Sequence, residues 1–180
     1  MTLRKIVTLP DPVLRRKAKP ITKFDKVLQI LIDDMIETMR EAPGVGLAAP
    51  QVNISEQLIV VEYSEDDDDE DDEDDEEIEK KPARPRNLYV MINPEIVKAS
   101  EEKVMGVEGC LSIPNIQGEV ERHEAIQIKG LNRFGKPQKL KVDGWMARIF
   151  QHEIDHLNGV LFTDLASRVW KFQEDEEHEL

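Results

Sequence analysis

The sequence predicts an α+β fold with antiparallel strands, and three observations support this prediction. Apolar residues recur at helical spacing over 22–41, near the N-terminus, and again over 144–158, near the C-terminus. Between these segments lie short runs of alternating or β-branched apolar residues, bounded by turn residues. Two of them, 125–131 and 138–142, flank the turn-rich stretch NRFGKP and should pair as an antiparallel hairpin.

The first predicted helix, 22–41, has one apolar face. The residues that form this face are Leu28, Leu31, Ile32, Met35 and Met39. Thr22 and Asp25 suit a capping pair at the start of the helix, and Pro43 and Gly44 end it. The pattern therefore predicts an N-terminal amphipathic helix.

The predicted strands begin after this helix and are interrupted once. QLIVVE at 57–62 is typical of a strand, and LYVMIN at 88–93 and the segment around 95–104 resume the pattern. Thirteen consecutive acids at 65–77 separate them. Such a run cannot be buried and repels itself, so we expect a disordered acidic insertion at about 64–86.

The net charge of −14 resides mostly in two segments. Without the thirteen acids of 65–77 the net charge is −1, and without the five acids of 174–179 as well it is +4. The folded body is therefore near neutral, and the overall charge says little about its ligand. The 180 residues fit one domain, which we expect over 1–170, followed by an acidic tail at 171–180.

The composition also bears on the cellular compartment. A single cysteine, Cys110, excludes an internal disulfide and suits a reducing cytosol. The apolar runs are far shorter than a membrane span, and MTLRKIVTLPDP at the N-terminus lacks the apolar region of a signal peptide. We therefore expect a cytoplasmic protein.

The second predicted helix, 144–158, is apolar on two sides. Asp143 is suited to cap it and Gly159 to end it. One face carries Trp145, Ile149, His152 and His156, and the opposite face carries Met146, Phe150, Ile154 and Leu157. A narrow polar sector remains, made of Arg148, Gln151, Asp155 and Asn158. A helix with this pattern is buried, so we expect the two histidines inside the protein.

QHEIDHLNG at 151–159 contains a His-Glu-x-x-His motif. Because residues four apart are neighbours on a helix, His152 and His156 can bind one cation together. Glu153 lies about a quarter turn away and can reach a water at the metal without being a ligand. A catalytic site of this kind needs three protein ligands and one open position.

The residues alone leave the third ligand open. The longer motif with a third histidine is excluded, because Phe162 occupies that position. Acids downstream of the motif are candidates, namely Asp164, Glu174, Glu176 and Glu177. Cys110 in VEGCLSIP is another, because a thiolate binds zinc or ferrous iron, although a lone cysteine is more often a small buried apolar residue.

Three segments together resemble the motifs of the peptide deformylase family. They are GVGLAAPQ at 44–51, EGCLS at 108–112 and QHEIDHLNG at 151–159, in the family's order and with similar spacing. The resemblance spans about residues 1–170 apart from the acidic insertion. It implies an α+β fold in which antiparallel sheets pack around a central buried helix that carries the HExxH motif.

The resemblance also implies a metal and a reaction. Cys110, His152 and His156 would bind one divalent ion, natively Fe²⁺, although such a site also accepts Zn²⁺, Ni²⁺ or Co²⁺. The implied reaction removes the formyl group from the N-terminal methionine of newly synthesised proteins and releases formate. The partners would be N-formylmethionyl peptides and nascent chains, with transient proximity to the ribosome and no direct contact with nucleic acid or membrane.

The resemblance assigns catalytic roles to four further residues. Glu153 would be the general base and proton carrier. The side-chain amide of Gln51 and the backbone N–H of Leu111 would donate hydrogen bonds to the oxyanion. Gly46 would let the backbone approach the substrate closely, in a slot too tight for acetyl and larger acyl groups.

The methionine side chain of the substrate requires an apolar pocket. The candidate wall residues are Val45, Trp145 and Ile149. Two positions depart from many relatives: Arg148 replaces an apolar residue, and Gln117 stands where some relatives carry a basic residue that holds the peptide. We also expect Glu108 to pair with Arg122 and hold the EGCLS segment in place.

Two other functions fit parts of the sequence. A peptidase with an HExxH motif and an acidic third ligand would have no need of Cys110. A non-catalytic binding module that acts through its acidic run would tolerate loss of the motif residues, yet all of them are intact.

The acidic run 65–77 should take no part in the chemistry. Deleting it should leave turnover on short formyl-peptides within about twofold, because surface changes far from a site rarely exceed roughly half a kcal/mol. The same deletion should tighten any ribosome association, most visibly at low salt, since it removes repulsion from RNA phosphates. A truncated enzyme that folds but no longer turns over a formylated dipeptide would contradict this prediction.

Overall fold

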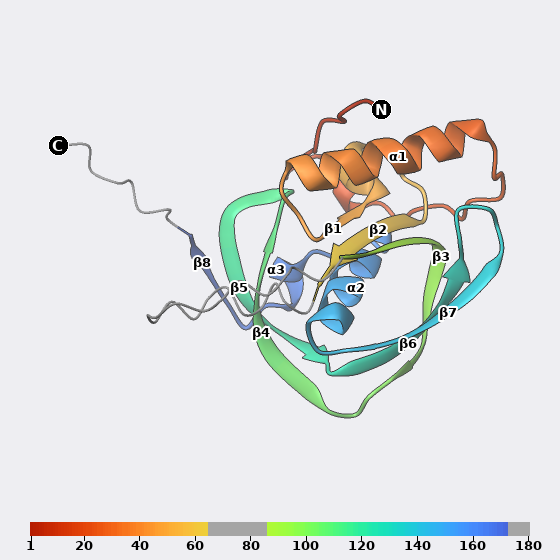
Figure 1. The fold of residues 1–180 in the computed structure, drawn as a ribbon. Coiled ribbons are helices and arrows are strands. Elements are labelled where there is room, and N and C mark those ends of the chain that lie inside the picture. The colour runs from red at the N-terminus through yellow and green to blue at the C-terminus, as the bar shows by residue number, and fades with distance from the viewer. Residues whose placement is uncertain (65–85, 173–180) are drawn as a thin grey trace, which may run out of the picture.

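The computed structural model describes residues 1–64 and 86–172. They form a mixed α+β fold with two antiparallel sheets (Figure 1). The helices are η1 (Pro12–Arg15), α1 (Lys26–Glu41), η2 (Ala49–Val52), α2 (Gly144–Leu157) and α3 (Phe162–Leu165). The strands are β1 (Gly46–Ala48), β2 (Leu58–Tyr63), β3 (Asn87–Ala99), β4 (Lys103–Cys110), β5 (Ile113–His123), β6 (Ala125–Leu131), β7 (Pro137–Asp143) and β8 (Arg168–Lys171).

The strands divide between a five-stranded sheet, ordered β1-β2-β3-β6-β7, and a three-stranded sheet, ordered β4-β5-β8. Every pair of neighbouring strands is antiparallel. The predicted hairpin is confirmed as β6 and β7, with Leu131 paired to Pro137 across the turn. The α+β class with antiparallel strands is therefore the observed one.

Two apolar clusters lie on opposite sides of β2. Because successive strand residues point to opposite faces, Leu58 and Val60 pack with α1, whereas Ile59 and Val61 pack with α2. In Figure 1, α1 lies on one side of β1 and β2, and α2 lies on the other side. Both faces of β2 are buried, which explains why its sequence is a continuous apolar run rather than an alternating one.

Two predicted boundaries were wrong. α1 begins at Lys26 rather than at 22, and its N-cap is Asp25, whose carboxylate accepts a hydrogen bond from the Leu28 N–H (3.0 Å). The segments 88–93 and 95–104 were predicted as two strands ending at 104, but β3 runs from Asn87 to Ala99. Its register shifts near Asn93, whose φ is +51°, and these irregularities broke the alternation that sequence reading relies on.

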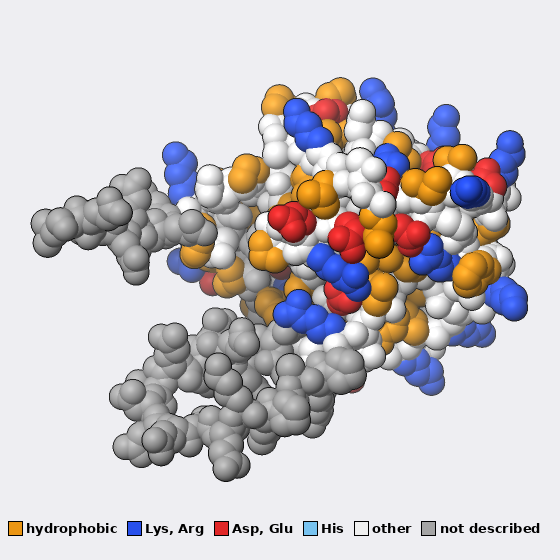
Figure 2. Space-filling model, turned by 45° about the horizontal axis from the view of Figure 1, so that its top comes forward, with side chains coloured by type: hydrophobic (Ala, Val, Ile, Leu, Met, Phe, Trp, Pro, Cys, Tyr) orange, Lys and Arg blue, Asp and Glu red, His pale blue; other side chains and the backbone are white. Residues whose placement is uncertain are grey.

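The predicted insertion at 64–86 falls mostly on 65–85, and the tail at 171–180 falls mostly on 173–180; both ranges lie outside the described residues. The strands that flank the insertion are adjacent, since Tyr63 of β2 pairs with Asn87 of β3. On the face shown in Figure 2, Lys and Arg side chains are interspersed with acidic and apolar ones. Within the described part of the chain, no helix is long and apolar enough to cross a membrane.

Glycines with positive φ stand at both ends of α2. Gly144 has φ +55°, and a Cβ atom there would meet no atom within 4 Å. Gly159 has φ +70°, and a Cβ atom there would lie 2.5 Å from the carbonyl oxygen of Arg15. The chain after α2 therefore passes directly against the N-terminal segment, at a distance that only glycine allows.

These two glycines provide a matched pair of substitutions. Gly144→Ala should lower the free energy of unfolding by about 1–2 kcal/mol, the usual cost of a left-handed backbone in an L-residue. Gly159→Ala should cost clearly more, because backbone must also move away from the new methyl group. Urea unfolding of the two variants at equal metal load measures the difference, and equal losses would contradict the close contact with Arg15.

Candidate metal centre and catalytic site

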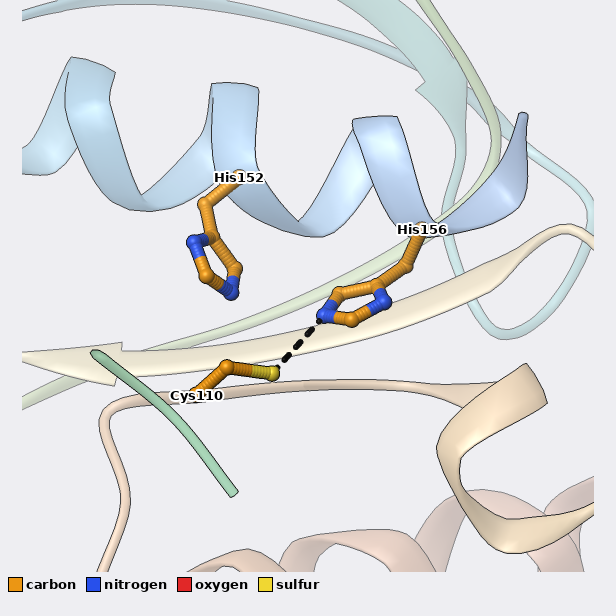
Figure 3. Close-up of side chains that lie close together, drawn as sticks. All are labelled: Cys110, His152 and His156. Atoms are coloured by element: carbon orange, nitrogen blue, oxygen red, sulfur yellow. Dashed lines mark hydrogen bonds between the residues drawn. The ribbon is translucent and has the colours of Figure 1, made fainter. Parts of the chain in front are cut away.

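Three potential ligands meet beside α2 (Figure 3). The ligating atoms of Cys110, His152 and His156 all lie within 4.8 Å of one another, and Cys110 Sγ lies 3.3 Å from His156 Nε2. Residues four apart on α2 rise by about 6 Å. Residues two apart on a strand rise by about 6.5 Å and face the same side. This match lets Glu108 of β4 contact His152 while Cys110 lies beside His156.

The end of β4 is shaped so that Cys110 reaches this point. The β4–β5 register shifts after Gly109, and Cys110 then pairs with Ile113 across a tight turn. The N-terminal segment supports the same region, because the Leu9 N–H donates to the Ser112 carbonyl (3.0 Å). The Val7 N–H donates in the same way to the carbonyl of Gln51 (2.8 Å).

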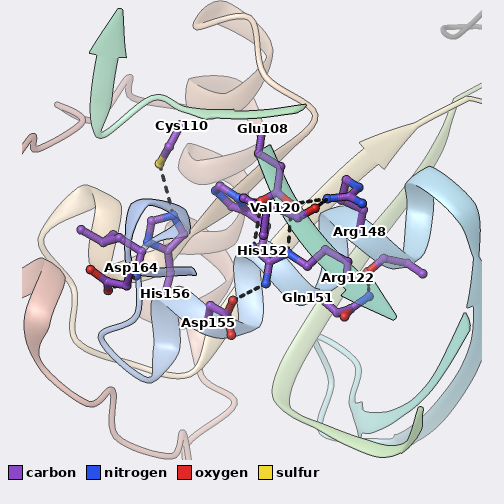
Figure 4. A network of polar contacts seen from close by, with 12 residues as sticks. Glu108, Cys110, Val120, Arg122, Arg148, Gln151, His152, Asp155, His156 and Asp164 are labelled. Atoms are coloured by element: carbon purple, nitrogen blue, oxygen red, sulfur yellow. Dashed lines mark hydrogen bonds and ion pairs between the residues drawn. The ribbon is translucent and has the colours of Figure 1, made fainter. Parts of the chain in front are cut away.

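The buried carboxylate of Glu108 orients His152 (Figure 4). His152 Nδ1–H donates to Glu108 Oε1 (2.8 Å), which leaves Nε2 of the ring for a metal. The predicted pair with Arg122 is confirmed, with Nε and Nη2 of Arg122 donating to the two carboxylate oxygens (2.9 and 2.8 Å). Burial would raise the pKa of Glu108, but the hydrogen bonds from Arg122 and His152 hold it at about 2.

The electrostatics of this group suit a cation. Burial would lower the pKa of His152, but hydrogen bonds with Cys110 and Glu108 raise it to about 10, so the surroundings favour a positive charge here. Burial holds the pKa of His156 well below its usual value, so this imidazole is neutral and keeps a lone pair for a metal. Its Nδ1 is buried without a hydrogen-bond partner among the described residues. A thiolate and two imidazoles are a donor set that binds Zn²⁺ or Fe²⁺, so the residues fit a divalent metal.

Glu153 lies next to the ligand group, within a buried setting. Burial raises the pKa of its carboxyl group to about 7, and its Oε2 atom has no hydrogen-bond partner among the described residues. Gly46 of β1 passes directly over it, because a Cβ atom at 46 would lie 2.7 Å from Glu153 Oε1. Only glycine fits at this position while Glu153 keeps its place.

Gln51 is buried in η2 and turns its amide group toward the cysteine. Its Oε1 accepts a hydrogen bond from the Ala48 N–H (2.9 Å), which fixes the orientation of the amide. Its Nε2 donates to Ser112 Oγ (3.2 Å) and lies 3.6 Å from Cys110 Sγ. A neutral donor is therefore held beside the candidate metal ligands.

A cavity of about 770 Å³ opens onto these groups. Its walls include every residue predicted for catalysis or for the substrate pocket: Val45, Gly46, Gln51, Leu111, Trp145, Ile149 and Glu153. Cys110 and His152 also line it. The structure thus brings segments that are far apart in the sequence to one cavity large enough for several residues of a peptide.

Comparisons with known proteins agree with this geometry. Residues 3–171 match the family model described as polypeptide deformylase. The chain is 49% identical over 179 residues to a peptide deformylase of Symbiobacterium thermophilum, covering 99% of this chain and 74% of that protein. It is 43% identical to peptide deformylase 1 of Bacillus subtilis, covering 98% and 96% of the two chains. The crystal structure of peptide deformylase from Thermotoga maritima aligns with a TM-score of 0.78 and 40% identity, covering 93% and 100% of the two chains.

The chain belongs to the polypeptide deformylase family. It is a metal-dependent hydrolase that removes the N-formyl group from the N-terminal methionine of newly synthesised proteins.

Asp164, an alternative candidate for the third metal ligand of the deformylase site, is bonded elsewhere. The Asp164 carboxylate accepts hydrogen bonds from the Arg15 guanidinium and, at 2.9 Å, from the Leu161 N–H. These bonds hold it at the start of α3 rather than at the histidine pair. The tail acids Glu174, Glu176 and Glu177 lie outside the described residues.

Several residues at the deformylase cavity were not expected from the sequence. Tyr63, Ile116 and Phe172 line it, and none of them carries a pattern that distinguishes a pocket wall from ordinary core or surface. Arg148 was expected in a narrow polar sector of the helix, but it is only 6% exposed and donates to the Glu108 carboxylate. Helical periodicity predicted the side of the helix on which Arg148 lies. It could not predict the hydrogen-bond partner of Arg148, because that partner, Glu108, belongs to β4.

Removing the thiolate separates the two sources of the third ligand. Cys110→Ala should lose most of a bound equivalent of metal after dialysis at high salt, because two imidazoles alone hold a divalent ion weakly. Asp164→Ala is the matched control and should keep its metal. Metal content is read by atomic absorption. If Cys110→Ala keeps a full equivalent and unchanged activity, the ligand assignment is wrong.

Proposed function

We propose that this deformylase works with one divalent metal held by Cys110, His152 and His156. The observation that supports this most directly is the convergence of the cysteine sulfur and two imidazoles within 4.8 Å, at the wall of a cavity that also contains Glu153. The metal, when bound, lowers the pKa of a coordinated water and polarises the formyl carbonyl. Fe²⁺ is the proposed native ion, and the same donors accept Zn²⁺, Ni²⁺ or Co²⁺.

Glu153 is the proposed proton carrier. A carboxyl group with a pKa of about 7 can accept a proton from the attacking water and return it to the departing amine near neutral pH. Burial in the cavity wall raises the pKa of Glu153. The surroundings that position the carboxylate therefore also adjust its pKa. The products are formate and a free N-terminal amine.

The proposed donors to the oxyanion are Gln51 and Leu111. Gln51 Nε2 is already oriented by the bond that its Oε1 accepts from Ala48, so it need not reorganise as charge develops. Leu111 directly follows Cys110 in the chain, and both residues line the cavity. Two donors placed beforehand stabilise the tetrahedral oxyanion more than they stabilise the planar formyl group.

The proposed basis for formyl selectivity is the narrow space beside Gly46. The backbone there lies so close to Glu153 that even a Cβ atom would collide with the carboxylate. A formyl carbon bears only hydrogen and fits such a slot, whereas the methyl group of an acetyl does not. The methionine side chain would occupy the apolar wall formed by Val45, Trp145 and Ile149.

The fold serves this site in the following proposed way. α2 acts as the central buried helix that carries the HExxH motif, and α1 is an amphipathic helix that covers the other face of the five-stranded sheet. Residues 1–170 form one catalytic domain, with an acidic insertion at about 64–86 and an acidic tail. A buried helix holds its side chains rigidly, which a site of this kind requires.

The proposed substrates are N-formylmethionyl peptides and nascent chains in the cytoplasm. Contact with the ribosome would be transient, and no direct binding to nucleic acid or membrane is proposed. The acidic run and tail repel RNA phosphates, and this repulsion makes any contact with the ribosome brief.

Glu153→Gln tests the proposed role of the carboxylate. The variant should keep its metal and lose about 100- to 10,000-fold in turnover, the range that general acid–base catalysis usually supplies. Formate release from formyl-Met-Ala by anaerobically purified protein measures the turnover, and metal analysis of the same sample is the control. Loss of the metal from Glu153→Gln would instead make Glu153 a ligand.

A further inference from the structure

Arg148 is a buried cation in the second turn of α2, facing the candidate metal centre. It is 6% exposed, and its guanidinium lies 5.3 Å from the ring centroid of Trp145, which lines the cavity. Nη1 donates to Glu108 Oε2 (2.7 Å) and to the Val120 carbonyl (2.8 Å). Nη2 donates to the Val104 carbonyl (2.7 Å). A buried arginine is costly unless every such bond is made, so its presence here requires a reason.

We propose that Arg148 is a positioning residue for the metal centre, acting through Glu108 on His152. The inference rests on the proposed ligand set. It assigns to Arg148 the task of holding the Glu108 carboxylate at the one orientation in which Oε1 meets His152 Nδ1 (Figure 4).

The hydrogen bonds of Glu108 show how this works. Oε1 accepts from Arg122 and His152, and Oε2 accepts from Arg122 and Arg148. Each oxygen thus has two donors. Without Arg148, Oε2 would keep only its bond from Arg122 Nε, and the guanidinium of Arg122 also bonds to Asp155 through Nη1. A carboxylate held by one guanidinium instead of two can tilt together with that guanidinium, and the imidazole that it orients then shifts with it.

The charges of the cluster support the same role. Glu108 and Asp155 are two buried or half-buried carboxylates, and Arg122 and Arg148 are the two guanidinium groups that bond to them. The four groups together are neutral. Removing Arg148 would leave one negative charge without its partner beside His152, where a buried charge must be paired.

β4 is built to accept this guanidinium. A Cβ atom at Gly106 would lie 2.6 Å from Arg148 Cζ, so any other residue there would displace it. Glu108 follows two residues later on the same face of the strand and receives the guanidinium directly. The Arg148 guanidinium therefore lies between the backbone of Gly106 and the ring of Trp145, and these two contacts fix its position.

A purely structural role would have a different signature. Arg148 also ties α2 to the carbonyls of β4 and β5, and this alone would make the residue a clamp between elements. Gln151 provides a comparison, since it is buried on the same helix and bonds to both backbone groups of His123 on β5 (3.1 and 2.9 Å). It clamps α2 to β5 without touching Glu108.

The test is the rate at which bound Co²⁺ is lost to excess EDTA, followed by the thiolate-to-cobalt absorbance band. Arg148→Met should release the metal about 10-fold faster than the parent, the lower end of the effect of removing a direct outer partner of a metal ligand, because Arg148 acts one bond further out through Glu108. Arg148→Lys can still donate to Glu108 Oε2, so its rate of metal release should lie between those of the parent and Arg148→Met. Gln151→Met should lose stability in urea while releasing the metal at nearly the parental rate.

The outcomes are distinguishable. Unchanged or slower release from a folded Arg148→Met overturns the proposal, as does equal acceleration in Gln151→Met. In a Glu108→Gln background, Arg148→Met should add little further acceleration, and full additivity also overturns the proposal. If Arg148→Met does not fold, parental release from Arg148→Lys counts against it. Absence of the thiolate band in the parent protein would instead disprove Cys110 as a ligand and with it the proposed metal site.

Discussion

The hydrogen bonds of the Glu108 carboxylate connect the strands and the helix that build the site. This carboxylate is buried, and it accepts hydrogen bonds from β5 through Arg122 and from α2 through Arg148 and His152. An unpaired carboxylate at that depth would cost several kcal/mol, so the three donors and the carboxylate have to be present together. This requirement docks the three-stranded sheet on the helix in a single register, and the same register brings Cys110 to the histidine pair.

Two spacings make that docking possible. The rise between His152 and His156 on the helix nearly equals the rise between Glu108 and Cys110 on the strand. One strand can therefore present a carboxylate to the first histidine and the cysteine sulfur to the second, with no loop between them. The irregular turn after Gly109 adjusts the last of these positions. Strand and helix are rigid elements, which suits ligands that must hold a metal geometry.

The other wall of the site comes from the segment that follows α1. β1 passes over Glu153 at Gly46, and η2 then turns Gln51 toward Cys110. The N-terminal segment bonds to the carbonyls of both Gln51 and Ser112, so it holds the two walls relative to each other. Burial in this arrangement raises the pKa of Glu153 to about 7, which is the range that the proposed proton carrier needs near neutral pH.

The sequence by itself determined the class of the fold, the β6–β7 hairpin and the family, and it supplied the residues of the proposed site. Those features depend on local chemistry: alternation sets a strand, a four-residue interval sets a pair on a helix, and three short motifs carry the family. The sequence could not determine that Arg148 is buried against Glu108, that Gly46 makes room for Glu153, or that Asp164 pairs with Arg15. Each of these is a contact between segments at least 40 residues apart in the chain, as between 108 and 148, and only the packing of α2 against both sheets decides which groups meet. β3 was predicted as two strands for a similar reason. Its pairing with both β2 and β6 keeps it continuous through register shifts that interrupt the alternating sequence pattern.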